Sequence, residues 1–146
     1  MTMEIRGLRP EDRGAWEVLA RGYKRFYETE LSDQDYEQAW QKLQLGQQVQ
    51  ALVADVNGQV QGLAHYLFHA SSWSDSVCYL QDLFVAEPAR GRGLAAALIA
   101  AVGERAAAAG AARCYWLTHR DNARARALYD RVGEHRGFVR YDLPMA

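Results

Sequence analysis

Apolar residues recur at helical spacing in two stretches near the start of the chain. The first stripe comprises Trp16, Leu19, Ala20 and Tyr23, and the second comprises Tyr36, Ala39, Trp40 and Leu43. Both follow the i, i+3, i+4, i+7 spacing of an amphipathic helix. The first helix is expected to begin near Pro10, and the second lies between a capping-box pattern at Ser32 and Asp35 and a stop at Gly46. A short strand near Glu4–Arg6 precedes them.

Runs rich in β-forming residues dominate the middle of the chain. They cover Ala51–Val56, Val60–Phe68, Val77–Val85 and Arg113–Thr118. Asn57-Gly58 separates the first two runs and predicts an antiparallel hairpin, because a type I′ turn needs positive φ at both central residues. Between the third and fourth runs, an alanine-rich segment over residues 93–109 predicts a helix that ends at Gly110. This series of strand, helix and strand is typical of a βαβ crossover between parallel strands.

The last part of the chain predicts one more helix and one more strand. Residues 122–132 show helical spacing, with Ala125, Leu128 and Tyr129 on one face. Residues 137–142 are interpreted as a closing strand. Together these elements predict an α+β fold with a mixed sheet, in which hairpins come first and the parallel crossover comes later.

Length and composition indicate one folded domain spanning residues 1–146. With 49% apolar, 24% charged and 11% aromatic residues, the chain lies far from the composition of disordered proteins. It has neither the apolar core of a secretory signal nor a run of ~20 apolar residues, which disfavours export and membrane spanning. Cys78 and Cys114 are far apart in the sequence and lack metal-ligand spacing. We therefore expect no disulfide framework, no metal site and a cytoplasmic location.

Charge is divided unevenly along the chain. Residues 1–70 hold ten acids and seven Lys or Arg, a net charge of −3, whereas residues 71–146 hold eight acids and ten Arg, a net charge of +2. The two values sum to the formal net charge of −1. A basic half suits an anion and an acidic half suits a cation, although scattered surface charge gives the same totals. Charge alone therefore does not decide the class of ligand.

A glycine-rich turn follows the third β-rich run and opens the alanine-rich helix. Its sequence is Arg90-Gly91-Arg92-Gly93-Leu94-Ala95-Ala96. Its two glycines let successive N–H groups converge, and a helix N-terminus adds about half a positive charge, so the turn predicts a diphosphate site. The spacing G-x-G-x-x-A also matches the dinucleotide-binding fingerprint. Hairpin strands precede it, however, and no ribose-binding acid follows about 20 residues on, so an NAD(P)-binding oxidoreductase stays an alternative.

Other residues extend this turn into a longer signature. Arg90-x-x-Gly93-x-Ala95 after a strand, Asn122 at the start of the next helix and Leu128-Tyr129 within it resemble the signature of the GNAT superfamily of acyl-CoA-dependent N-acetyltransferases. The strings YLQDLFV (79–85) and ALYDRVGEHRGFVRYD (127–142) are most similar to its histone/polyamine acetyltransferase-like branch. The resemblance implies α/β/α layers around a twisted, mostly antiparallel sheet of about six to seven strands with a central parallel crossover. It also implies acetyl-CoA as the acyl donor.

The resemblance further implies how acetyl-CoA is held. Its diphosphate would lie on the turn at 90–96, and its pantetheine would pair with the strand end formed by Leu83, Phe84 and Val85. Asn122 would hydrogen-bond to it, and a backbone N–H near Val85 would stabilise the oxyanion. Tyr129 is the expected catalytic general acid, because a phenol with a pKa of about 10 is protonated at neutral pH and can supply the proton that a leaving thiolate needs.

The acceptor side of the expected site contains several polar candidates. Gln81 stands where many relatives have a glutamate base, and an amide cannot titrate. Strand alternation turns Asp82 away from Gln81, which indicates a structural role unless a bulge re-aims it. We expect ordered water to take the amine's proton, helped by Glu28, with Tyr27, Glu28 and Gln81 contacting the substrate. His65 is interpreted as a satisfied, partly buried histidine, with orientation of the substrate as the alternative.

These observations predict direct acetyl transfer to a primary amine of a small molecule, a polyamine or a lysine side chain. A non-catalytic acyl-CoA-binding sensor is the alternative from a different class. The arginines of residues 71–146 also suit nucleic acid, but no motif that reads RNA or DNA accompanies them, so no such partner is expected. Trp73 is expected at an acceptor pocket or a subunit contact. The lengthened helix end before Gly137, typical of the branch named above, favours a homodimer.

Overall fold

A computed structural model describes residues 2–145, and the chain divides into two compact units, Met1–Trp116 and Leu117–Ala146. The strands of the first unit are β1 (Met3–Gly7), β2 (Gln50–Val56), β3 (Gln59–His69), β4 (Val77–Val85) and β5 (Cys114–Trp116). Its helices are α1 (Arg13–Phe26), α2 (Asp33–Leu45) and α3 (Leu94–Ala108), with 3₁₀ turns at Pro10–Asp12 and Glu87–Ala89. The second unit contains α4 (Ala123–Val132).

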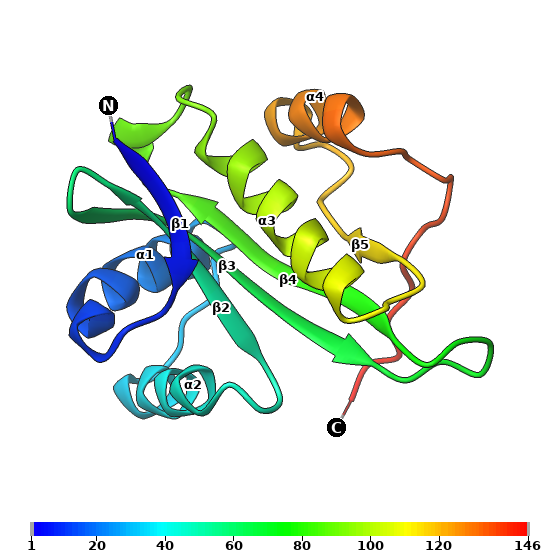
Figure 1. Cartoon of the computed structure of the whole chain (residues 1–146), viewed down its shortest axis with the longest axis horizontal. Helices are drawn as coiled ribbons and strands as arrows, with labels where there is room; N and C mark the ends of the chain where they lie inside the picture. The colour runs from blue at the N-terminus through cyan, green and yellow to red at the C-terminus, as the bar shows by residue number, and fades with distance from the viewer. Residues whose placement is uncertain (1, 146) are drawn as a thin grey trace. The chain divides into compact units, whose positions relative to one another are not determined.

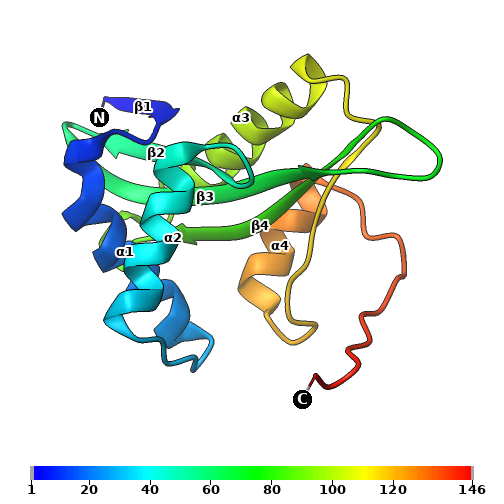
Figure 2. The same cartoon turned by 90° about the horizontal axis from the view of Figure 1, so that it is seen from below.

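The strands of the first unit form one mixed sheet in the order β1-β2-β3-β4-β5 (Figure 1). Neighbouring strands are antiparallel except β4 and β5, which are parallel and joined through α3. The helices α1 and α2 lie on one face of the sheet and α3 lies on the other, as Figure 2 shows from below. This α+β arrangement confirms the predicted fold class, with five strands in residues 2–145 where six to seven were expected. It differs from the parallel, doubly wound sheet of a dinucleotide-binding fold.

Local turn and cap chemistry places these elements as the sequence predicts. Asn57 and Gly58 have φ values of 53° and 86°, so both central residues of the hairpin are left-handed. Ser32 caps α2 by accepting a hydrogen bond from the Asp35 N–H, while the Asp35 side chain accepts one from the Ser32 N–H. Gly46 ends α2 in the left-handed conformation.

Each face of the sheet is covered by its own hydrophobic core. On the α1 and α2 face, Trp16 and Trp40 pack with their ring centroids 5.4 Å apart and contact the buried Leu63. On the α3 face, Leu98 is fully buried. A Cβ built at Gly62 would lie 3.2 Å from Leu98 Cδ1, so glycine at this position lets α3 approach the sheet closely.

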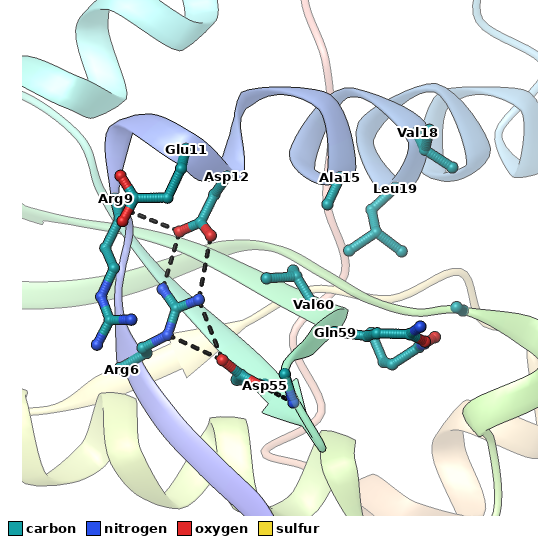
Figure 3. A pocket seen from close by; sticks show the side chains of 13 residues that line it. Arg6, Arg9, Glu11, Asp12, Ala15, Val18, Leu19, Asp55, Gln59 and Val60 are labelled. Carbon is teal, nitrogen blue, oxygen red and sulfur yellow. Dashed lines mark hydrogen bonds and ion pairs between the residues drawn. The ribbon is translucent and has the colours of Figure 1, made fainter.

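Arg6 of the first strand binds the buried Asp12 just before α1 and the partly buried Asp55 of β2. Its guanidinium donates to both oxygens of Asp12 at 2.8 and 3.1 Å and to Asp55 at 3.2 Å. The Asp12 carboxylate also accepts from the Arg9 backbone N–H at 2.7 Å. An open cavity of about 710 Å³ lies beside this network (Figure 3), and the predicted cofactor and acceptor residues do not line it. Because the carboxylates already occupy Arg6, the network is interpreted as structural.

The second unit is shorter in regular structure than the sequence predicts. The helix α4 forms as expected, capped by the Asn122 side chain, which accepts from the Ala125 N–H at 3.3 Å. The strand predicted at 137–142 is wrong, because residues 134–145 form no regular structure. A strand requires a partner for its backbone groups. Apolar side chains of this segment are exposed instead, namely Phe138, Val139, Tyr141, Leu143 and Met145.

Candidate active site

The glycine-rich turn has the backbone conformation that an anion site needs. Gly91 and Gly93 have φ values of 82° and 81°, and Gly93 is the N-cap of α3. No side chain caps this helix end, and residues 91–93 are exposed. The backbone N–H groups of the first turn are therefore left for a ligand with acceptor oxygens. Arg90 and Arg92 flank the turn and add positive charge, so the segment fits a diphosphate.

Conformation, and not space, makes glycine necessary at these two positions. A Cβ at Gly91 or Gly93 would meet no atom within 4 Å. Both residues nevertheless have the left-handed φ values that L side chains rarely adopt. Gly103, within α3, offers a contrast, because its φ is not left-handed and a Cβ there also meets nothing within 4 Å.

The second half of β4 has an edge without a strand partner in the described sheet. The ladder with β5 covers only Cys78 to Leu80, opposite Cys114 to Trp116. On the other side, the Ala86 N–H donates to Gln61 of β3 at 2.8 Å. Since backbone groups alternate along a strand, the N–H and C=O of Leu83 and Val85 point away from β3, to the open edge. These groups suit the amide-bearing arm of an extended ligand.

Arg90 joins this open edge to the glycine-rich turn. Its Nε donates to the Val85 carbonyl at 3.1 Å, and its guanidinium lies 5.6 Å from the centroid of the Phe84 ring. The strand end and the turn are therefore held together by one side chain. The backbone donor of Val85 suits the arm of a coenzyme A molecule, and those at the start of α3 suit its diphosphate.

A bulge at Gln81 changes the direction of the next side chain. His65 of β3 pairs with Asp82, whereas the following residue, Tyr66, pairs with Leu80, so Gln81 is the extra residue. Leu80 and Asp82 consequently lie on opposite faces of the sheet, although regular alternation would place them on the same face. Asp82 lies on the face covered by α1, and Gln81 is exposed. The strand thus contains the bulge that, as stated above, would turn the Asp82 side chain toward a different face.

Asp82 belongs to a partly buried hydrogen-bonded group that we call the Asp82 cluster, formed by Trp16, Tyr23, His65 and Asp82. The Asp82 Oδ2 lies 2.9 Å from the His65 Nδ1, and the Trp16 indole N–H donates to the His65 Nε2 at 3.0 Å. Tyr23 also hydrogen-bonds to Asp82. The side chains of His65 and Asp82 are 12% and 17% exposed, which confirms that His65 is satisfied and partly buried.

The ionisation of this cluster follows from its contacts. Burial pushes the pKa of Asp82 upward, but the interactions with His65, which come next in size, together with the hydrogen bond from Tyr23 and the charge of Lys24, outweigh it and leave the pKa below its ordinary value. Burial, followed by the Asp82 charge, raises the pKa of Tyr23 and also that of Tyr27. Asp82 is therefore a carboxylate next to two neutral phenols at neutral pH.

Aromatic rings lie near this carboxylate. The Tyr23 ring lies 5.0 Å from that of Tyr27 and meets Phe84 edge-on at 6.1 Å. Tyr27 is 43% exposed. Glu28, which follows it, is exposed and has a φ of 54°, and its N–H donates to the Arg25 carbonyl. The structure thus groups Tyr27 with Asp82, a residue that the sequence alone did not place in the site.

Within the second unit, Asn122 and Tyr129 are seven residues apart on and before α4. The Asn122 Oδ1 is used as the helix cap, while its amide nitrogen is a donor that the cap does not use. The Tyr129 carbonyl accepts from the Gly133 N–H at the helix end. The cofactor contact of Asn122 and the acid role of Tyr129 stay predictions.

Two cysteines that are distant in the sequence face each other in the sheet. Cys78 and Cys114 are direct partners in the parallel ladder, and both are free thiols. Burial raises the pKa of the Cys78 thiol to about 12, with a smaller contribution from Cys114. Burial also raises the pKa of Cys114. Neither is a reactive thiolate, so the pair does not suit nucleophilic catalysis.

Residues 2–145 contain neither a cluster suited to a metal ion nor a helix that could span a membrane. No group of three or more His, Cys, Asp or Glu side chains there is arranged to hold a metal ion. None of the helices described combines the length and apolar character needed to cross a bilayer. Trp73, in the turn between β3 and β4, is 94% exposed.

Sequence comparison assigns the class of protein that this sheet and turn define. Residues 16–133 match the model of the acetyltransferase (GNAT) family, and the chain belongs to that family. It is 34% identical over 133 residues to the D-amino-acid N-acetyltransferase HPA3 of Saccharomyces cerevisiae, covering 88% of this chain and 82% of that protein. It is also 35% identical over 146 residues to the uncharacterized N-acetyltransferase YhfO of Bacillus subtilis, covering 97% of each.

Solved structures agree on the fold. The aminoglycoside acetyltransferase AAC(6')-Iy, in complex with a bisubstrate analogue, matches with a TM-score of 0.87 at 19% identity, over the whole of both chains. A ribosomal-protein-alanine N-acetyltransferase from Brucella melitensis matches with a TM-score of 0.84 at 19% identity, over 99% of this chain and 100% of that chain. The chain is thus an N-acetyltransferase whose acetyl donor is acetyl-CoA.

Proposed function

We propose that this protein transfers the acetyl group of acetyl-CoA to a primary amine of a small molecule by direct attack, without an acyl-cysteine intermediate. The observation that carries the proposal is the open edge of β4 that leads, through Arg90, into the uncapped start of α3. Bound acetyl-CoA supplies an acetyl thioester, whose carbonyl carbon is open to attack by a neutral amine. The high thiol pKa of Cys78 supports an attack that uses no cysteine.

The cofactor would be held by two groups of backbone atoms. The first is the end of β4, where Leu83 and Val85 offer backbone groups to the pantetheine and Phe84 lies between them. The second is the turn, for the diphosphate, with the residues Arg90, Gly91, Arg92, Gly93, Leu94, Ala95 and Ala96. Leu94 is buried, so it would contribute its N–H and not its side chain. Asn122 would donate from its amide nitrogen.

The chain's own residues would move the protons and stabilise charge. The Val85 N–H, on the open edge, would donate to the oxygen that becomes negative during attack. Tyr129 would donate a proton to the departing sulfur. Ordered water near Glu28 would accept the proton of the amine, while Tyr27 and Gln81 would contact the acceptor. The exposed positions of Glu28 and Gln81 are compatible with these roles.

Relatives support an amine acceptor without identifying it. HPA3 is named for D-amino acids and AAC(6')-Iy for an aminoglycoside, and both substrate classes carry primary amines. A polyamine or a lysine side chain remains within the proposed class. A non-catalytic acyl-CoA sensor is the competing function, and it predicts tight binding with no released thiol for any amine.

Calorimetric titration tests the cofactor site. CoA is expected to bind, pantetheine to bind at least ~100-fold more weakly because it lacks the diphosphate, and NAD not to bind. Gly93→Ala should weaken CoA binding by about tenfold or more, since alanine disfavours the left-handed φ that aims the N–H groups. Gly103→Ala is the matched control and should leave the Kd for CoA unchanged. A native protein without affinity for CoA would refute the proposal.

We also propose a homodimer in the cytoplasm. The free thiols of Cys78 and Cys114 are compatible with a reducing compartment. Phe138 and Val139 expose 85% and 72% of their surface in the C-terminal segment, and a second copy would cover such residues. Light scattering should give twice the 16.4 kDa chain mass. A double variant, Phe138→Ser with Val139→Ser, should shift this toward one chain, whereas Val18→Ser, an exposed site on α1, should not. A native monomer at every concentration would contradict the dimer.

A further inference from the structure

The Asp82 cluster suggests which amines the enzyme prefers. We propose that Asp82 is an anionic anchor for a second positive charge on the acceptor, so that linear diamines and longer polyamines are favoured over monoamines and amino acids. This inference rests on the proposed function above, because it concerns the acceptor of that reaction. In this proposal Asp82 binds the acceptor, and a different group accepts the proton of the reacting amine.

The charge of the cluster follows from which atoms can donate. An indole N–H only donates, so the His65 Nε2 that faces Trp16 at 3.0 Å must accept and carries no proton. The His65 proton is therefore on Nδ1, from which it is donated to Asp82 at 2.9 Å. His65 is neutral in this arrangement. Because Tyr23 is neutral as well, the cluster carries one negative charge, which resides on Asp82.

This negative charge retains capacity for a ligand. A carboxylate accepts about four hydrogen bonds, and the donors within the cluster are His65 and Tyr23. Lys24 acts on Asp82 from α1, but its ammonium lies over the Tyr23 ring, 5.7 Å from the centroid. Within residues 2–145, no Lys or Arg side chain forms an ion pair with Asp82 within 4.0 Å, and its contact with the neutral His65 is a hydrogen bond. Lys24 therefore weakens the field of the carboxylate without neutralising it.

The surroundings of Asp82 are those that bind alkyl ammonium ions. The rings of Tyr23, Tyr27 and Phe84 lie on the same side of the sheet as the carboxylate. Aromatic faces attract a cation, and they also cover the methylene groups of an alkyl chain. An amino acid would bring a carboxylate of its own toward Asp82, and the two like charges would repel each other.

The pKa of Asp82 argues against a role as proton acceptor. A carboxyl group whose pKa lies below its ordinary value holds a proton poorly and, as a constant anion, stabilises ammonium instead of neutral amine. Such a carboxylate favours the reaction only when it binds an ammonium group other than the amine that reacts. Asp82 and Val85 are separated by three residues of β4, which is roughly 10 Å at ~3.3 Å per residue. One amine would react near Val85 while the other remains protonated at Asp82.

Matched amine pairs test this division of roles. Cadaverine is compared with pentylamine, and diaminoheptane with heptylamine, since the members of each pair differ by one amino group. In Asp82→Asn, kcat/KM for the diamines should fall about 10- to 100-fold, through KM, while the monoamines change less than about threefold. Calorimetry on CoA-saturated protein should show the same loss of cadaverine affinity without any turnover. Lys24→Gln should strengthen diamine binding by about two- to fivefold, because it removes a competing cation.

Controls separate this inference from a general loss of structure or of activity. Glu104→Gln removes a carboxylate from α3, on the other face of the sheet, and should change neither amine pair. An unchanged Kd for CoA in Asp82→Asn shows that the fold is intact. Equal loss of kcat for diamines and monoamines would overturn the anchor, and so would equal retention. If the native enzyme acetylates no amine, the proposed function fails. The role of Asp82 as an anchor is then tested independently by whether Asp82→Asn weakens the binding of cadaverine.

Discussion

Replacing Tyr129 with phenylalanine is expected to lower kcat about 10²- to 10⁴-fold while the Kd for CoA stays within about twofold. The range is the usual contribution of a positioned proton donor or acceptor. Phenylalanine keeps the ring and its packing but removes the O–H, so the sulfur would have to leave as a bare thiolate. Released thiol, followed under saturating acetyl-CoA and amine, measures kcat, and calorimetry measures the affinity for CoA.

Tyr141→Phe is the matched control for this variant, because Tyr141 lies in the exposed C-terminal segment and loses the same hydroxyl. It should retain native kcat. An equal decrease in the affinity for CoA would show that Tyr129 binds the cofactor and does not supply the proton. A native protein that binds CoA but acetylates no amine would identify the sensor, which has no kcat to lose.

Replacing Asp12 with asparagine is expected to lower the free energy of unfolding by about 3 kcal/mol at neutral pH. Asp12 is 5% exposed and accepts from Arg6 through both oxygens. Removing one member of a buried ion pair leaves the other charge without compensation, at a cost of about 3–5 kcal/mol. Because Asp55 still holds Arg6, we expect the lower end of that range. Urea denaturation measures the change, and Glu11→Gln, an exposed neighbour, should stay within about 0.5 kcal/mol of the native protein.

The same substitution should change the response to acid. Hydrogen bonds from Arg6 hold the pKa of Asp12 below its unfolded value near 3.9. A carboxyl group with a lowered folded pKa stabilises the protein above the unfolded pKa, and this contribution is lost as the pH falls through the folded pKa. The difference between native protein and Asp12→Asn should therefore narrow below about pH 4. A difference that is constant with pH would rule out the ion pair as its cause.

Local signals in the sequence predicted most of the fold. The Asn57-Gly58 pair, the Ser32 cap and the glycine-rich turn act through residues near one another in the chain, and each formed as expected. The strand at Val77–Val85 also has the predicted bounds. Strand length elsewhere depended on partners. β5 is only three residues long where six were expected, because its ladder with β4 ends at Leu80.

The acceptor side was harder to predict because its contacts are distant in sequence. Asp82 meets His65 at a separation of 17 residues, and His65 meets Trp16 at a separation of 49. A single extra residue at Gln81 decides which face Asp82 occupies, because regular alternation would place Asp82 on the same face as Leu80. His65 and Asp82 can both be read from the sequence. The bulge has no recognisable sequence pattern, so the strand register that pairs the two residues could not be predicted.

The unpaired stretch of β4 also bears on how the protein behaves when no ligand is present. Exposed strand edges pair with edges of other chains, and proteins protect them with bulges and charged side chains. Here a bulge stands at one end of the stretch and the Arg90 guanidinium covers the Val85 carbonyl at the other. Coenzyme A would complete this protection by occupying the backbone groups between them. We therefore expect bound coenzyme A to improve the colloidal stability and shelf life of the purified enzyme by filling that edge.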